Sequence, residues 1–235
     1  MRKTIFRADE RGFANHGWLK THHMFSFANY YDVERMGFGV LRVLNDDIVE
    51  PGMGFGTHPH DNMEIISIPL KGIMAHKDSQ GNESTIKEGD IQVMSAGTGL
   101  THSEYNFSKE VDLNFLQIWI FPKTYNIAPS YQEKTFHYPQ DKWVLVASPD
   151  KSENSLPINQ DCYLYLGKFS KNNSIGYTKK SDSNGLFVFI IEGKATIEHE
   201  SLHKRDAIGI ENPEKISIDL EENSFILLID LPMKR

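Results

Sequence analysis

The chain has 235 residues, of which 39% are hydrophobic and 24% charged, and 25 Lys and Arg against 32 Asp and Glu give a formal net charge of -7. This composition is typical of a folded globular protein, and its acidic surplus argues against binding nucleic acid through the phosphate backbone. The longest uninterrupted apolar run, residues 186–191, is far shorter than the roughly 18 to 20 residues that span a bilayer, so no membrane segment is predicted.

The N-terminal segment becomes charged again before an apolar stretch of signal-peptide length can form. The single cysteine, Cys162, cannot form an internal disulfide. We therefore expect a cytoplasmic protein stabilised by packing, in which Cys162 is a small buried hydrophobic residue and not a nucleophile.

Short β-branched and aromatic segments, separated by Gly, Asn, Asp and Pro, recur about every eight to twelve residues, as in an all-β sandwich or barrel. In chain order, strands are predicted at 37–43, 62–69, 72–77, 84–86, 91–94 and 113–121, and then at 143–147, 162–169, 186–191, 194–199, 206–210, 215–219 and 224–230. Between the two series, residues 122–142 contain three prolines and no sustained alternation, and are predicted to be an irregular connection.

The two series share their spacing. Gly72 and Gly193 each open a strand after an apolar run, and Gly89-Asp90 precedes a strand much as Arg205-Asp206 does. This similarity predicts a tandem repeat of one β-domain. We expect an N-terminal domain over 1–122, a connection over 123–142 and a C-terminal domain over 143–235.

His58 and His60 form the sharpest local feature, since residues i and i+2 of a strand project from one face and can present two imidazoles to one metal ion. His102 and Glu104 repeat this spacing further along the chain. Three imidazoles and one carboxylate suit Fe(II), Mn(II), Ni(II), Cu(II) or Zn(II), and can leave positions open to a bidentate substrate or to dioxygen.

Glu64 is a second candidate for the carboxylate, because strand parity places it on the same face as His58 and His60. Either Glu64 or Glu104 could be the ligand, and the other would then hold an imidazole by accepting its hydrogen bond. The opposing interpretation is that a His-x-His pair arises by accident in a chain with ten histidines.

Three runs resemble the pirin family of bicupins: Pro51-Gly-Met-Gly-Phe-Gly-Thr-His-Pro-His60, Gly89-Asp-Ile-Gln-Val-Met-Ser-Ala-Gly-Thr-Gly-Leu-Thr-His-Ser-Glu104 and Leu116-Gln-Ile-Trp-Ile-Phe-Pro122. The resemblance covers residues 10–122 well and the C-terminal half only loosely. It implies an all-β fold of two tandem cupin (jelly-roll-like) β-barrels.

The same resemblance implies one divalent transition metal in the N-terminal cupin domain, bound by His58, His60, His102 and Glu104, with Glu64 behind these ligands. Fe(II) is the favoured ion, and Zn, Mn, Ni, Cu and Co are alternatives. The C-terminal cupin domain is expected to be metal-free, with its histidines His199 and His203 at the surface.

For function, the resemblance implies a metal-dependent dioxygenase similar to quercetin 2,3-dioxygenase, which opens a flavonol-type ring with O2 and uses Glu104 as the catalytic proton acceptor. The expected partners are a small flavonol-like aromatic molecule and O2. The alternatives are a metal- or redox-responsive regulatory protein of the pirin type without turnover, and a cupin that acts on another substrate. Aromatic side chains suited to a flat pocket are Phe25, Phe27, Phe55, Tyr105, Phe107, Phe115 and Trp119.

Overall fold

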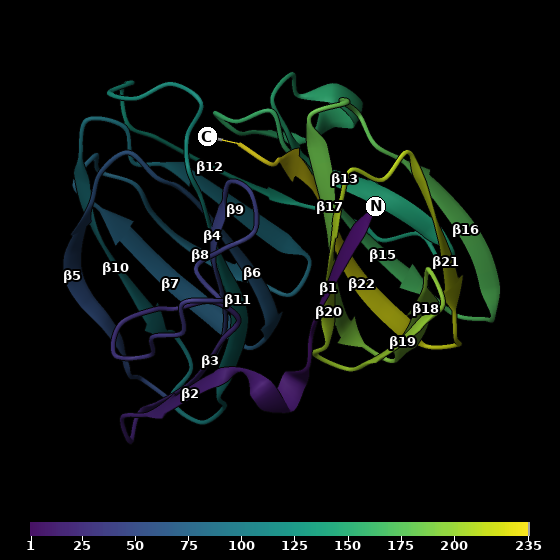
Figure 1. Cartoon of the computed structure of the whole chain (residues 1–235). Coiled ribbons are helices and arrows are strands. Elements are labelled where there is room, and N and C mark those ends of the chain that lie inside the picture. The colour runs from purple at the N-terminus through teal and green to yellow at the C-terminus, as the bar shows by residue number, and fades with distance from the viewer. Residues whose placement is uncertain (235) are drawn as a thin grey trace.

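The computed structural model describes residues 1–234, which form two β-sandwiches that lie side by side (Figure 1). Each sandwich combines a seven-stranded main sheet with a four-stranded small sheet. The helical elements of these residues are two single 3-10 turns, η1 (Ala8–Glu10) and η2 (Ser152–Asn154). No helix within residues 1–234 has the length and apolar character needed to cross a membrane.

The first half of the chain forms most of the N-terminal sandwich. Its main sheet has the strand order β12 (Ser130–Thr135), β9 (Asp90–Ser95), β6 (Glu64–Lys71), β11 (Leu113–Ile120), β4 (Leu41–Val49), β3 (Leu19–His23) and β2 (Gly12–Asn15). Its small sheet has the order β5 (Gly54–His60), β10 (Leu100–Asn106), β7 (Ile73–Asp78) and β8 (Glu83–Lys87).

The C-terminal sandwich repeats this arrangement. Its main sheet has the strand order β1 (Arg2–Phe6), β20 (Ala207–Glu211), β17 (Asn184–Glu192), β22 (Ser224–Pro232), β15 (Tyr163–Phe169), β13 (Lys142–Ser148) and β14 (Leu156–Pro157). Its small sheet has the order β16 (Asn173–Thr178), β21 (Lys215–Leu220), β18 (Lys194–Ile197) and β19 (Glu200–His203).

Matched turns account for the shared spacing in the sequence. The chain leaves the main sheet for the small sheet at Gly72 in the first half and at Gly193 in the second, with φ of 83° and 81°. Such positive φ values are easily reached only by glycine. The turn before the next main-sheet strand is also shared, because the Asp90 carboxylate accepts a hydrogen bond from the Lys87 N–H and the Asp206 carboxylate accepts one from the N–H of the residue three positions before it.

The structure corrects several details of the prediction. The strand predicted at 37–43 is β4, over Leu41–Val49, and β2, β3 and β16 were not predicted. The expected barrels are open sandwiches, because the main and small sheets of each half have separate hydrogen-bond ladders within residues 1–234. The segment expected to be an irregular connection contains β12, which pairs with β9. β1, which was not predicted, crosses to the C-terminal main sheet and pairs with β20. β1 and β12 end their sheets, and edge strands rich in polar residues show little hydrophobic periodicity.

The division into 1–122, 123–142 and 143–235 stays a prediction, although β1 and β12 pair across it.

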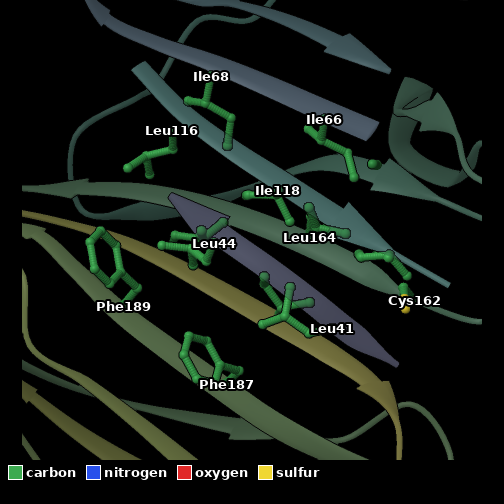
Figure 2. Packing of buried hydrophobic residues seen from close by; sticks show 14 of the residues in the cluster. Leu41, Leu44, Ile66, Ile68, Leu116, Ile118, Cys162, Leu164, Phe187 and Phe189 are labelled. Carbon is green, nitrogen blue, oxygen red and sulfur yellow. The ribbon is translucent and has the colours of Figure 1, made fainter. Parts of the chain in front are cut away.

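The two main sheets face each other through one apolar core. Figure 2 shows side chains from β4, β6 and β11 of the first half in one cluster with side chains from β15 and β17 of the second half. Cys162 lies in this core, fully buried, and burial raises the pKa of its thiol. It therefore has the environment of a small hydrophobic residue and not of a reactive thiolate.

The interiors of the two sandwiches differ in polarity along one row of facing residues. In the N-terminal main sheet, residues opposite one another on β9, β6, β11, β4 and β3 form a polar row of Gln92, Ser67, Gln117, Asn45 and His23. The corresponding row of the C-terminal main sheet is Ile208, Val188, Leu228, Tyr165 and Leu145, all within one apolar core. Because buried polar groups cost free energy unless they are partnered, the polar row marks the N-terminal sandwich as the one that contains a site.

Candidate metal centre

His58, His60 and His102 come together inside the N-terminal sandwich. His58 and His60 belong to β5, and His102 belongs to the neighbouring β10, where it lies opposite His58 in the ladder. One ligand nitrogen of each of the three lies within 4.8 Å of the others. We call these residues the histidine trio. By contrast, His199 and His203 are exposed in the C-terminal half, as expected.

The hydrogen bonds of the histidine trio leave ring nitrogens available for a metal ion. The Gly56 carbonyl lies 2.8 Å from His58 Nδ1. Because a carbonyl only accepts, Nδ1 carries the proton and Nε2 keeps its lone pair. Nε2 of His60 and both ring nitrogens of His102 are buried and have no hydrogen-bond partner within residues 1–234. Unpartnered buried nitrogens are rare in native proteins, and this donor set fits one divalent transition metal.

Burial keeps two members of the trio, His60 and His102, in the protonation state that a metal requires. Burial, aided by the neighbouring His58, lowers the pKa of His60 to about 4. Burial and the adjacent His58 and His60 lower the pKa of His102 to about 2. Metal ligation requires neutral imidazole, so His60 and His102 are ready to bind an ion at neutral pH without first losing a proton.

Glu104 is buried on β10, beyond a β-bulge that separates it from His102. The amide nitrogen of Gln117 lies 3.3 and 3.2 Å from the two carboxylate oxygens of Glu104, and the Ser67 hydroxyl lies 3.3 Å from Oε1. Burial nevertheless outweighs these bonds and raises the pKa of Glu104 to about 7. The carboxylate is not among the ligand atoms that lie within 4.8 Å of one another, but it lines the same cavity as His58 and His60. Its role as a fourth ligand stays a prediction.

Glu64 does not lie beside the trio as strand parity suggested. It opens β6 in the main sheet, and a turn with Asn62 at φ 44° separates it from β5, so the alternation from His60 does not continue to it. The Glu64 carboxylate accepts hydrogen bonds from Ser95 Oγ at 2.7 Å and from the backbone N–H of Asn159 at 3.0 Å. These bonds connect the N-terminal main sheet to the segment that precedes β15.

A cavity of about 480 Å³ adjoins the trio, which is a typical size for a small-molecule site. Four of the aromatic residues proposed from the sequence line it: Phe27, Phe55, Phe115 and Trp119. The other three lie elsewhere, with Phe25 in the core between the main sheets and Tyr105 and Phe107 exposed to solvent.

The sequence analysis missed the residues that hold Glu104 and a further set of polar side chains in the cavity. The missed residues are Ser67 and Gln117 beside Glu104, and Thr21, His23, Asn45 and Asp47 along the cavity wall. A signal was present, since Ser67 and Gln117 each interrupt an apolar strand at a position that faces the interior. A polar residue there needs a partner, so the interruption itself indicates a site.

The chain is similar to known proteins over nearly its whole length. A Pirin family profile matches residues 6–120, and a profile described as the quercetinase C-terminal cupin domain matches residues 145–231. A quercetin 2,3-dioxygenase of Escherichia coli (strain K12) is 44% identical over 226 residues, which is 96% of this chain and 97% of the relative. A pirin-like protein of Caulobacter vibrioides is 39% identical over 225 residues, or 94% and 96% of the two chains. The crystal structure of the bacterial pirin YhhW from Escherichia coli in complex with nickel(II) has a TM-score of 0.94 at 42% identity, covering 98% of this chain and 99% of that chain.

Proposed function

Because the chain belongs to the pirin family of bicupins, we propose that it is a metal-dependent dioxygenase that opens a flavonol-type ring with O2. The observation that carries the proposal is the convergence of three imidazoles, each with a ring nitrogen free of hydrogen bonds within residues 1–234, beside an aromatic-lined cavity that Glu104 also lines. His58, His60 and His102 are assigned as metal ligands, and Glu104 as the fourth ligand and proton acceptor.

Fe(II) is the first candidate for the ion, and the nickel(II) in the related Escherichia coli structure makes Ni(II) the second. When bound, the ion supplies Lewis acidity that lowers the pKa of a flavonol hydroxyl coordinated to it. Glu104, which lines the cavity and is held by Gln117 and Ser67, would accept the hydroxyl proton as the general base. Gln117 orients the carboxylate for this transfer.

The cavity also bears on the alternative of a regulatory protein without turnover. An enzyme needs space for substrate next to the ion, whereas a sensor tolerates a closed site. His58, His60 and Glu104 all line the cavity, and aromatic side chains suited to a flat ring system form much of its remaining wall. This arrangement favours the enzyme.

Cytoplasmic location, expected from the single cysteine among other features, stays a prediction.

The test is O2 uptake by protein reconstituted anaerobically with Fe(II), measured on addition of quercetin. We expect uptake by the wild type and by a His203→Ala control, whose histidine is exposed in the other half. We expect none from a His58→Ala, His102→Ala double variant that circular dichroism shows to be folded. Absence of uptake by wild-type protein with stoichiometric iron would overturn the proposed activity on quercetin.

A further inference from the structure

Away from Glu104, the cavity beside the histidine trio is lined by four buried polar side chains: Thr21 and His23 of β3 and Asn45 and Asp47 of β4. We call them the far polar group. Thr21 lies opposite Asp47 and His23 lies opposite Asn45 in the ladder between the two strands, so the four occupy adjacent positions on one face. None is more than 4% exposed, although all four line the cavity.

The hydrogen-bonding capacity of the far polar group is only partly used within the protein. Oδ1 of Asp47 is buried and has no partner among the described residues. His23 Nδ1 lies 2.9 Å from Asn45 Oδ1, so Nδ1 carries the proton and Nε2 of this imidazole is left as an acceptor. A buried carboxyl oxygen without a partner is costly unless a ligand or a water molecule bonds it. The group therefore offers acceptors to a hydroxyl that enters the cavity.

The polar row fixes how far His23, on the outer strand of the far polar group, lies from Gln117 beside the catalytic carboxyl. Gln117 bonds Glu104, Asn45 lies opposite Gln117 on the next strand, and His23 lies opposite Asn45 on the strand after that. Neighbouring strands are about 4.8 Å apart, so His23 lies about 10 Å from Gln117 along the sheet. A ligand held at the trio must therefore extend beyond one aromatic ring to reach His23.

Aromatic side chains shape the cavity at this far end. The His23 ring centroid lies 5.2 Å from that of Phe27 and 6.4 Å from that of Tyr30, whose ring is nearly parallel to it. Phe115, which lies opposite Asp47 on β11, also lines the cavity. The far end thus combines apolar ring surfaces with a few hydrogen-bond acceptors, a combination that suits a phenolic ring.

We propose that the far polar group is a second binding subsite, which hydrogen-bonds a hydroxyl at the distal end of a planar, multi-ring phenolic ligand whose other end is held at the histidine trio. This inference rests on the proposed function and specifies its substrate class. It predicts that the protein discriminates between ligands with the same metal-chelating oxygens according to the hydroxyls that they carry on their outer rings. A purely structural role for the four residues predicts no such discrimination.

The test compares two flavonols on the full-length protein loaded with Zn(II), under anaerobic conditions that prevent turnover. One is 3-hydroxyflavone, which has only the chelating oxygens, and the other is quercetin, which carries further hydroxyls on both outer rings. Their dissociation constants are measured by absorbance titration for the wild type and for a Thr21→Val, Asp47→Leu double variant. This variant removes two facing polar side chains together, so that neither is left buried against a missing partner.

A matched control is Gln92→Leu, which removes a buried polar side chain of the polar row in the same sheet but outside the cavity lining. We expect wild type and control to bind quercetin about tenfold more tightly than 3-hydroxyflavone, the effect of one hydrogen bond at a buried site. We expect this ratio to fall to about one in the double variant.

Three results separate the possible failures. An unchanged ratio in the folded double variant overturns the subsite, and leaves the proposed function standing. If the double variant does not fold, the wild type alone decides, because equal affinity for the two flavonols contradicts the subsite. Failure of the wild type to bind either flavonol overturns the proposed function and the subsite together.

Discussion

The side-chain amide of Gln117 donates hydrogen bonds to the carboxylate of Glu104, with its nitrogen 3.3 and 3.2 Å from the two oxygens. Gln117 belongs to β11 of the main sheet and Glu104 to β10 of the small sheet, so this contact joins the two sheets across the site. The Ser67 hydroxyl lies 2.7 Å from Gln117 Oε1 and donates to it, which fixes the amide with its NH2 group toward Glu104. The polar row thus orients the proposed proton acceptor.

Replacing Gln117 tests this positioning role. The bonds from Gln117 stabilise the ionised carboxylate, so a Gln117→Leu substitution should raise the pKa of Glu104 further. The acid limb of the pH profile for quercetin-dependent O2 uptake should then move to higher pH, with activity at neutral pH lower by about tenfold. Gln92→Leu serves as the control. A pH profile that stays in place while activity falls would indicate a structural effect only.

Replacing Glu104 itself tests the proton transfer. Glu104→Gln keeps the size and shape of the side chain but cannot accept the hydroxyl proton, so turnover should fall by about 10²- to 10⁴-fold, the usual contribution of a general base. The change is measured as the initial rate of O2 uptake, corrected for metal content by elemental analysis. Turnover near the wild-type rate would remove Glu104 from the role of base.

Replacing Glu64 should affect the stability of the protein and not its metal binding. Its carboxylate bonds Ser95 and the backbone of Asn159, so Glu64→Leu should lower the free energy of unfolding by about 1 to 3 kcal/mol, because it leaves buried donors unpaired. Metal stoichiometry should not change, whereas His60→Ala should reduce it sharply. Urea unfolding and elemental analysis measure the two effects. Loss of metal from a folded Glu64→Leu protein would restore Glu64 as a candidate ligand.

Asp47 should make the metal-free protein less stable as the pH rises. Burial chiefly raises its pKa from 3.8 to about 7. Between these values the folded protein holds a proton that the unfolded chain has lost, so stability falls with increasing pH from about 4 to about 7 and the full penalty is present above that range. A pKa difference of about 3 between the folded and unfolded states corresponds to a loss of roughly 4 kcal/mol in the free energy of unfolding.

The measurement is urea unfolding of metal-free wild-type and Asp47→Asn proteins between pH 4 and pH 8. Glu104, whose pKa is also raised to about 7, contributes the same direction in both proteins, so the difference between the two curves reports Asp47 together with its electrostatic coupling to Glu104. The free energy of unfolding of the variant should increase relative to that of the wild type as the pH rises. Parallel curves would mean that Asp47 titrates normally in the folded state.

The β class, the repeat and the two histidine-containing pairs could be predicted from local sequence patterns. Alternation between apolar and polar residues is a property of near neighbours, so most strands could be predicted without knowing their partners. The glycines Gly72 and Gly193 were informative because their backbone conformation is a local requirement. The spacing of His58 and His60, and of His102 and Glu104, placed each pair on one face of a strand for the same reason. The resemblance to pirins then joined the two pairs into one predicted ligand set.

Which residues meet across strands could not be predicted from local patterns. Register depends on pairings between segments far apart in the chain, and local periodicity carries no information about them. The ladder that sets His102 opposite His58, the turn that directs Glu64 away from the trio, and the alignment of Gln117 with Asn45 and His23 are all of this kind. The polar row could be seen in the sequence only as isolated interruptions of apolar strands, and it became continuous, with Gln117, Asn45 and His23 in the cavity wall, when five strands paired in register.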